Sequence, residues 1–203
     1  MKRIAIITSS LFLFLSLSSL QAQENKAGIK GGANYSNLTG DDVSGTTSRL
    51  KYHIGGFATI AVTEFFALQP ELLYSTKGAD TDGGELYLST LDVPFLAKIY
   101  LSDNFNIHAG PQLGVMLNAE QEINDEREDV KKQFRDLYLE GVLGLEFVTE
   151  AGLNFGARYN YSLSTIGDDY ESSVTVGNVT ATSTVEAPDV RNSVLQLFVG
   201  FSF

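Results

Sequence analysis

Apolar and polar residues alternate along most of the chain with a period of two. Between residues 91 and 101 every odd position is apolar, while Asp92 and Lys98 fall on even positions. Residues 153–163 repeat this arrangement, and residues 54–62 carry mostly apolar groups at even positions. Because successive residues of a β-strand point to opposite faces, each segment has one apolar and one polar face. The pattern predicts an all-β protein.

Eight such segments are joined by connections that alternate in length. The segments span residues 28–38, 50–62, 66–77, 85–101, 105–119, 137–148, 152–163 and 190–203. Long stretches follow the odd-numbered segments, at 39–49, 78–84, 120–136 and 164–189, and tight turns near 63–65, 102–104 and 149–151 follow the even-numbered ones. This alternation is typical of outer-membrane barrels. We therefore expect an eight-stranded antiparallel up-and-down transmembrane β-barrel with short periplasmic turns and long extracellular loops.

The aromatic residues of the apolar face indicate that this face meets lipid, and not the interior of a soluble barrel such as a lipocalin. They separate by height into two belts, as amphipathic aromatics do where hydrocarbon meets water. The belt near the long loops is predicted to contain Tyr35, Tyr52, Tyr74, Tyr87 and Tyr161. The belt near the short turns is predicted to contain Phe66, Phe105, Phe147, Phe155, Phe201 and Phe203.

Charged residues on the opposite face are predicted to line the lumen. They are Lys30, Lys51, Glu71, Lys77, Asp92, Lys98, Glu140, Glu146 and Arg158. Five positive and four negative groups are nearly balanced, so they can pair across a narrow lumen, which lowers the cost of burying them. An eight-stranded barrel leaves room only for side chains. We expect a plugged interior and no open aqueous pore.

Composition excludes several functions. The chain has 203 residues and a net charge of −11, so it lacks the clustered basic residues that nucleic-acid binding needs. It has no cysteine, which removes disulfides, thiolate metal sites and cysteine nucleophiles. Its only two histidines are His53 and His108, which are expected near opposite ends of the barrel and so cannot share a metal.

The N-terminus has the layout of a secretory signal. Lys2 and Arg3 precede an apolar stretch at residues 4–20, and Ala22 offers a small residue for cleavage. The alternative, a membrane anchor, is disfavoured because the apolar run is short and lacks a stop-transfer cluster. We expect a signal peptide at residues 1–22 and one barrel domain at 23–203.

No motif for catalysis, a cofactor or a metal emerges from the sequence. His53 follows Asp41, Asp42 and Ser48, and it is expected to be a hydrogen-bonded lumen residue more than a general base. Residues 80–85 begin like a calcium loop but lack the third ligand and the distant Glu. Paired acids at 41–42, 80/82 and 168–169 are expected to be solvated in loops, with bridging of divalent cations to lipopolysaccharide phosphates as the alternative.

Two loops have patterns of their own. In residues 120–135 acids precede bases, which suits a short helix with its dipole, and a protein partner at loop 120–136 is a minority alternative to a solvated cap. Residues 172–185 alternate as strands do and are expected to extend the seventh and eighth strands beyond the membrane, where an exposed edge can pair with another chain.

The segments ALQPELLYSTKG (67–78), LDVPFLAKIYL (91–101) and GARYNYSLSTIG (156–167) resemble the PorT-like family of small OmpX/OmpA-like outer-membrane barrels. The alternating segment 193–203 ends on Phe203 and resembles the C-terminal strand that the bacterial barrel-assembly machinery recognises. The resemblance implies a Gram-negative outer membrane, contacts with its lipid and lipopolysaccharide, and an eight-stranded barrel; some members are tied to protein secretion.

Four functions stay open. We favour a monomeric, non-enzymatic barrel with a structural or interaction role through its extracellular loops. The alternatives are a narrow porin-like channel or small-solute transporter, a membrane-embedded enzyme, and a soluble lipid-binding barrel.

Overall fold

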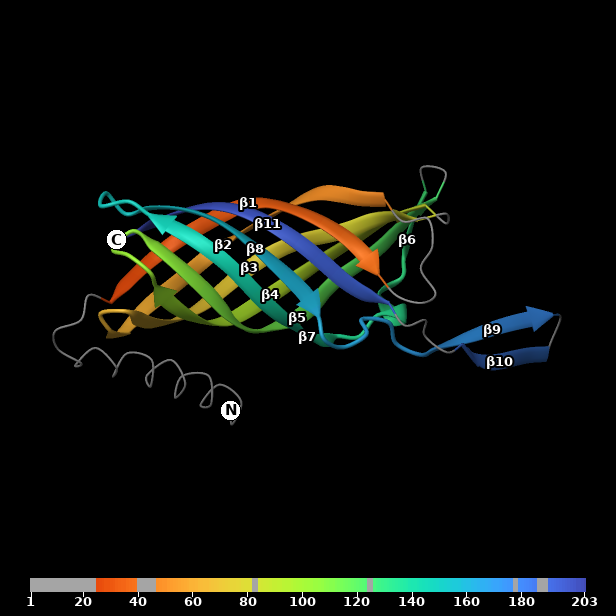
Figure 1. Cartoon of the computed structure of the whole chain (residues 1–203). Helices are drawn as coiled ribbons and strands as arrows, with labels where there is room; N and C mark the ends of the chain where they lie inside the picture. The colour runs from red at the N-terminus through yellow and green to blue at the C-terminus, as the bar shows by residue number, and fades with distance from the viewer. Residues whose placement is uncertain (1–24, 40–46, 82–83, 124–125, 177–178, 186–189) are drawn as a thin grey trace, which may run out of the picture.

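Eight long strands close into an antiparallel barrel in the computed structural model, which describes residues 25–39, 47–81, 84–123, 126–176, 179–185 and 190–203 (Figure 1). The barrel strands are β1 (Lys26–Thr39), β2 (Thr47–Thr63), β3 (Phe66–Thr81), β4 (Gly84–Tyr100), β5 (Phe105–Ile123), β7 (Leu137–Val148), β8 (Leu153–Ser162) and β11 (Arg191–Ser202). Each pairs with the next barrel strand along the chain, and β1 pairs with β11 to close the cylinder. The predicted fold class is confirmed.

The period of two in the sequence becomes an inside and an outside. Along β11, Val194 and Gln196 are buried, while Leu195 and Leu197, which alternate with them, are exposed. Large apolar side chains cover the outer wall, and Leu143 on β7 keeps 65% of its surface exposed. An exposed apolar wall of this extent is what a bilayer requires of a barrel.

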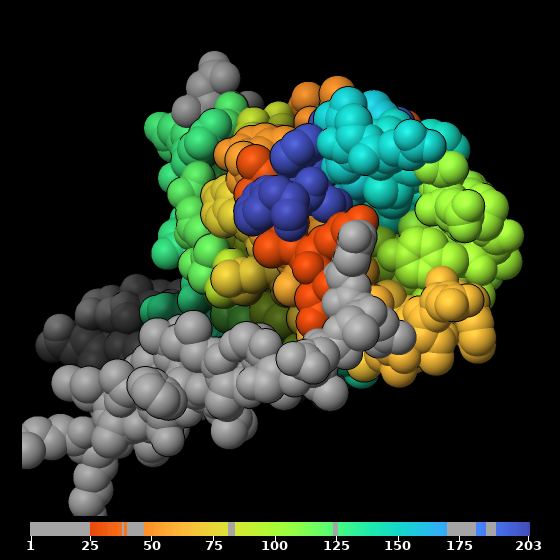
Figure 2. Space-filling view, turned by 90° about the vertical axis from the view of Figure 1, so that its left-hand side faces the viewer, coloured from red at the N-terminus to blue at the C-terminus, as the bar shows by residue number. Residues whose placement is uncertain are grey.

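The short turns gather at one end of the barrel, together with the end of β11 (Figure 2). In the β7–β8 turn, Gly152 has a φ of +85°, a left-handed conformation that favours glycine, and its amide donates to Thr149 O at 3.0 Å. At the same end, the amide of Phe203 donates to Ala27 O at 2.8 Å, so the last residue is tied to the start of β1.

The prediction of a helix in residues 120–135 is wrong. β5 continues to Ile123 and pairs with β6 (Glu126–Asp129), and only a short 3-10 turn, η1 (Lys131–Gln133), follows. Arg127 pairs across this hairpin with Glu120 and Glu122, so the charges that suggested helical pairs are used between strands. Extending an existing ladder avoids the cost of nucleating a separate helix.

The expectation for residues 172–185 is also wrong in its connectivity. β9 (Tyr170–Val176) and β10 (Val179–Val185) are strands, but they form a two-stranded sheet separate from the barrel. β8 ends at Ser162, and the chain then crosses the barrel mouth before β9 begins, so the ladder of β8 is interrupted. The hairpin projects from the long-loop end (Figure 1).

Candidate functional site

The lumen contains a network of paired charges. Eight of the nine predicted lumen residues are buried, and together they are all the buried Lys, Arg, Asp and Glu residues in the described ranges. We call them the lumen charge network: Lys30, Glu71, Lys77, Asp92, Lys98, Glu140, Glu146 and Arg158. Four are cations and four are anions, so the network is formally neutral, as buried charges without solvent need to be.

Glu71 joins three strands in the part of the network nearer the short turns. Its carboxylate accepts from Lys30 Nζ at 2.7 Å on β1 and from Arg158 Nη1 at 2.8 Å on β8. Gln69 Nε2 also donates to it at 2.7 Å, and Lys98, which pairs with Glu146, donates to Gln69 Oε1 at 2.8 Å. Each ionised group in this part therefore has an opposite charge as its partner. All of them except Lys30 also have a neutral hydrogen-bond partner.

Lys77 forms the second centre, nearer the long loops. Its ammonium lies 3.2 Å from Asp92 and 3.1 Å from Glu140, and it donates to the hydroxyl of Tyr138 at 3.0 Å. The amide of Gln112 donates to Glu140, so the excess negative charge is shared with a neutral donor. One buried ammonium thus links strands β3, β4 and β7, and Gln112 joins β5 to them through Glu140.

Lys51 is placed differently from the prediction. Its ammonium pairs with Glu85 at 2.9 Å and lies 3.9 Å from the centre of the Tyr87 ring, at the outer end of the barrel. The β2–β3 register shifts between Ser48 and His53, so a strict period of two fails at Lys51. Removing Lys51 from the predicted set turns five cations against four anions into four against four.

The residues around Tyr87 form an ionic cluster on the strand extensions. Arg127 lies 4.6 Å from the Tyr87 ring, and Arg49 pairs with Asp80 at 2.7 Å and with Glu85 at 2.8 Å. Burial acts to raise the pKa of Glu85, but the hydrogen bonds from Lys51 and Tyr87 and the charges of Lys51 and Arg49 together outweigh it and hold this pKa below its usual value. Tyr87 is therefore a cation-binding ring within this cluster, and not only a member of a lipid belt.

The other predicted belt residues lie on the outer wall to different degrees. Tyr35, Tyr52, Tyr161, Phe147, Phe155, Phe201 and Phe203 are exposed, whereas Tyr74, Phe66 and Phe105 are half-buried. Tyr159 and Phe95, which the prediction omitted, are also exposed on the wall.

Three aromatic residues lie inside the barrel, and none of them was among the predicted lumen residues. Phe57, Phe198 and Tyr138 are buried, and each is paired across the ladder with a glycine: Gly28, Gly156 and Gly114 respectively. A Cβ added at these glycines would lie 2.3, 2.3 and 2.2 Å from the facing ring. The rings therefore occupy the space above the glycines. In the sequence, these three aromatics fall at positions of the polar face, and this placement could have indicated that they point into the barrel.

An apolar cluster fills the outer end of the barrel. Its buried members are Ala79, Leu86, Leu88, Met116, Ala119, Val130, Tyr138 and Ile166. Part of it comes from the connections: Arg135 N donates to Ile166 O at 2.9 Å, and Ile166 N donates to Val190 O at 2.8 Å. The loops between β6 and β7 and between β8 and β9 are thus bonded together over the mouth.

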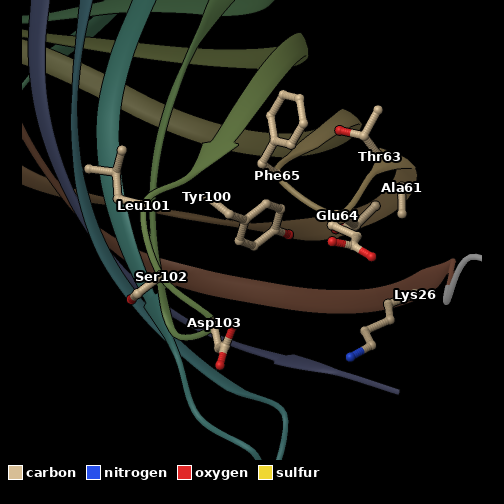
Figure 3. Close-up of a pocket in the computed structure, with 10 residues that line it drawn as sticks. Lys26, Ala61, Thr63, Glu64, Phe65, Tyr100, Leu101, Ser102 and Asp103 are labelled. Atoms are coloured by element: carbon tan, nitrogen blue, oxygen red, sulfur yellow. The ribbon is translucent and has the colours of Figure 1, made fainter.

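The periplasmic end is hollow by comparison. A cavity of about 650 Å³ lies inside the mouth, lined by residues that include Lys26, Thr59, Glu64, Tyr100 and Asp103 (Figure 3). Its inner wall ends at Thr59, which donates to Gln69 at 2.8 Å and so meets the lumen charge network.

Both histidines are buried inside the barrel. His53 is 1% exposed, and its Nδ1 lies 2.6 Å from Asn34 Oδ1; His108 is 2% exposed and lies over Gly144. Asp41 and Asp42 lie outside the described residues. Within the described ranges, no group of three or more His, Asp or Glu side chains is placed to hold a metal ion.

The fold, the apolar wall and the charge-filled lumen define a class: an integral β-barrel of the bacterial outer membrane. Residues 21–168 match the outer membrane protein beta-barrel domain family, and the chain belongs to that family. No curated protein matches the sequence. No helix in the described ranges is long and apolar enough to cross a membrane.

Solved structures with a similar fold include two bacterial surface proteins. Neisserial surface protein A is 12% identical with a TM-score of 0.55, and the attachment invasion locus protein Ail of Yersinia pestis is 13% identical with a TM-score of 0.52. Each comparison covers 89% of this chain and 100% of the other. The family places the protein in the outer membrane.

Proposed function

We propose that this barrel is a non-enzymatic interaction protein that acts through its extracellular segments and does not conduct solutes. The observation that carries the proposal is the filled interior. Paired charges occupy the middle of the lumen, and the apolar cluster with its bonded loops occupies the outer end. A solute would have to displace both, and separating buried ion pairs costs several kcal/mol each.

The extracellular part supports the same proposal. The loops that carry Arg135 and Ile166 are bonded together and form a cap over the mouth. This cap, the β5–β6 hairpin and the β9–β10 hairpin together form a folded surface at the long-loop end (Figure 1). Similar folds include a protein named for attachment and invasion, which is consistent with a role at the cell surface.

A narrow channel is the second candidate, and the periplasmic cavity favours it. This cavity supplies the entrance of a passage, from the mouth to Thr59. Beyond Thr59 a channel needs the lumen charge network to open.

Conductance in planar bilayers separates the two candidates. We expect the purified protein to give no stepwise conductance. A porin of known conductance, added to the same bilayers, shows that an open barrel would be detected. Stepwise conductance of the unaltered protein would overturn the proposal.

A further inference from the structure

The cavity at the short-turn end has the size and the lining of a binding site. Its volume of about 650 Å³ lies within the range of small-molecule sites. Two turns contribute to its rim: the β2–β3 turn brings Glu64, and the β4–β5 turn brings Asp103. The ring of Tyr100, at the end of β4, lies between these two turns (Figure 3). Two carboxylates and an aromatic ring therefore share one hollow.

Both turns are held in place by hydrogen bonds to the barrel. Tyr100 N donates to Phe65 O at 2.9 Å, which fixes the β2–β3 turn against β4. The β4–β5 turn is tied to β7, because Val148 N donates to Asn104 O at 2.7 Å and Asn104 Nδ2 donates to Val148 O at 2.8 Å. The rim is thus formed before a ligand arrives, which lowers the entropy lost on binding.

The hydroxyl at the inner end of the cavity is an acceptor. Thr59 is 8% exposed and donates its single hydroxyl proton to Gln69 Oε1 at 2.8 Å. Gln69 Oε1 also accepts from Lys98, and Gln69 Nε2 donates to Glu71, so the direction of the bond from Thr59 is fixed. Toward a ligand, Thr59 Oγ1 can therefore only accept a hydrogen bond.

The charges that line the cavity are in negative excess. Glu64 and Asp103 supply two carboxylates, and Lys26 is the only base among the lining residues. Glu150, on the β7–β8 turn, adds a third carboxylate in an adjoining hollow of about 330 Å³. Acceptor oxygens, negative charge and an aromatic face together suit a cation with several N–H donors. In the part of the chain that the structure describes, no three Asp, Glu or His side chains are placed to hold a metal ion, which favours an organic cation.

We propose that this cavity binds an organic cation with a guanidinium or primary ammonium group, carried either by a free amine or by an Arg or Lys side chain of a peptide. The charged group lies over the Tyr100 ring between Glu64 and Asp103, and its N–H groups donate to these carboxylates and to Thr59 Oγ1. The inference goes beyond the proposed function, which concerns the opposite end of the barrel.

Two matched peptides test the charge requirement. Acetyl-Gly-Arg-Gly-amide carries a guanidinium, and the same peptide with citrulline in place of Arg has nearly the same shape without the charge. The full-length protein in detergent micelles is titrated with each peptide and followed by NMR. We expect the Arg peptide to shift the amide signals of Glu64, Tyr100 and Asp103, and the citrulline peptide to bind at least about tenfold more weakly. Spermidine represents the free amine, and the tighter of the two cationic probes identifies the source of the cation.

Substitutions at the rim test the position of the site. Glu64→Gln and Asp103→Asn keep the shapes of the side chains, and each should weaken binding of the Arg peptide by about fivefold. Lys26→Met removes the only base of the lining and should tighten binding by about twofold or more. Glu150→Gln is the matched control, because it makes the same change on the same rim but outside the larger cavity; it should alter the dissociation constant by less than about twofold. Gel mobility before and after heating in SDS verifies that every variant has a folded barrel.

Three results would overturn the inference. They are the absence of shifts at both turns with about 10 mM of either cationic probe, equal binding of the citrulline peptide, and a Glu150→Gln variant that weakens binding as much as Glu64→Gln does. The last result would show that the rim attracts cations only by its overall charge. Loss of this site leaves the proposed function as it is, whereas a barrel that conducts in bilayers removes the proposed function and leaves the cation site.

Discussion

Removing the charge of Glu71 tests the lumen most directly. Glu71→Gln keeps the shape of the side chain but leaves Lys30 and Arg158 without their shared anion. Lys30 Nζ and Arg158 Nη1 lie 2.7 and 2.8 Å from this carboxylate, and the side chains of all three residues are at most 1% exposed. Water therefore cannot solvate the two cations that lose their anion.

The expected loss is large because two cations are affected. Breaking one buried ion pair by removing one partner typically costs about 3–5 kcal/mol. Glu71 serves two cations, but Lys30 also lies 4.3 Å from the centre of the Phe198 ring, which offers partial compensation. We therefore expect Glu71→Gln to lower the free energy of unfolding by about 3–5 kcal/mol and not by twice that amount.

Urea unfolding in lipid vesicles measures this loss. The chain has no tryptophan, so the folded fraction is best followed by gel mobility in SDS without heating. Glu126→Gln, on the exposed strand β6, is the matched control and should leave the midpoint unchanged. Adding Lys30→Met to Glu71→Gln should recover part of the loss, because one unpaired cation is removed. An unfolding midpoint of Glu71→Gln equal to that of the unaltered protein would refute the buried-pair reasoning.

Four further changes probe other parts of the barrel. Gly114→Ala places a Cβ about 2.2 Å from the Tyr138 ring and should cost about 1–3 kcal/mol in urea unfolding; made in a Tyr138→Ala variant, the same change should cost little, because the ring is gone. Leu143→Lys, at an exposed position of β7, should cost about 2–4 kcal/mol in vesicles, whereas detergent micelles should reduce the effect. The lowered pKa of Glu85 means that its carboxylate stabilises the fold above about pH 4.3 and loses this effect as pH falls through the folded pKa; Glu85→Gln should therefore lower the midpoint at pH 7, with a difference that shrinks in acid. Deleting Phe203 should reduce the amount of folded barrel in outer-membrane fractions, and equal amounts would argue against an assembly signal.

The barrel was predictable because its physics is local. Alternation in residues 91–101 specifies a strand with two different faces, and Asp92 and Lys98 mark the face that the structure buries. Short turns without room for crossover connections then impose antiparallel neighbours. No long-range information is needed for these steps.

The exceptions required information that alternation does not contain. Lys51 lies beside a register shift, and a shift of one residue exchanges inside for outside. Tyr138 and Phe198 have lumen parity, but their role depends on the facing glycines Gly114 and Gly156, which are distant in sequence. The apolar cluster at the outer end depends on how Ile166 and Val190 return over the mouth, and their segment has no strand pattern to place it.

The position of the apolar cluster explains why the rest of the lumen is charged. A segment that is apolar on both faces for the length of a membrane crossing is difficult to carry through water without aggregation, so a barrel strand keeps one polar face. On β4, Leu86 and Leu88 fill the interior at the outer end, whereas Asp92 and Lys98 occupy it further in. A buried ionic interior is no more stable than an apolar one of equal volume. The charges are therefore better understood as a requirement of export and insertion, offset by neutral pairing, while apolar packing closes the barrel where the strands extend beyond the bilayer. A lumen filled in this way supports the proposed function, in which the segments beyond the bilayer make the contacts.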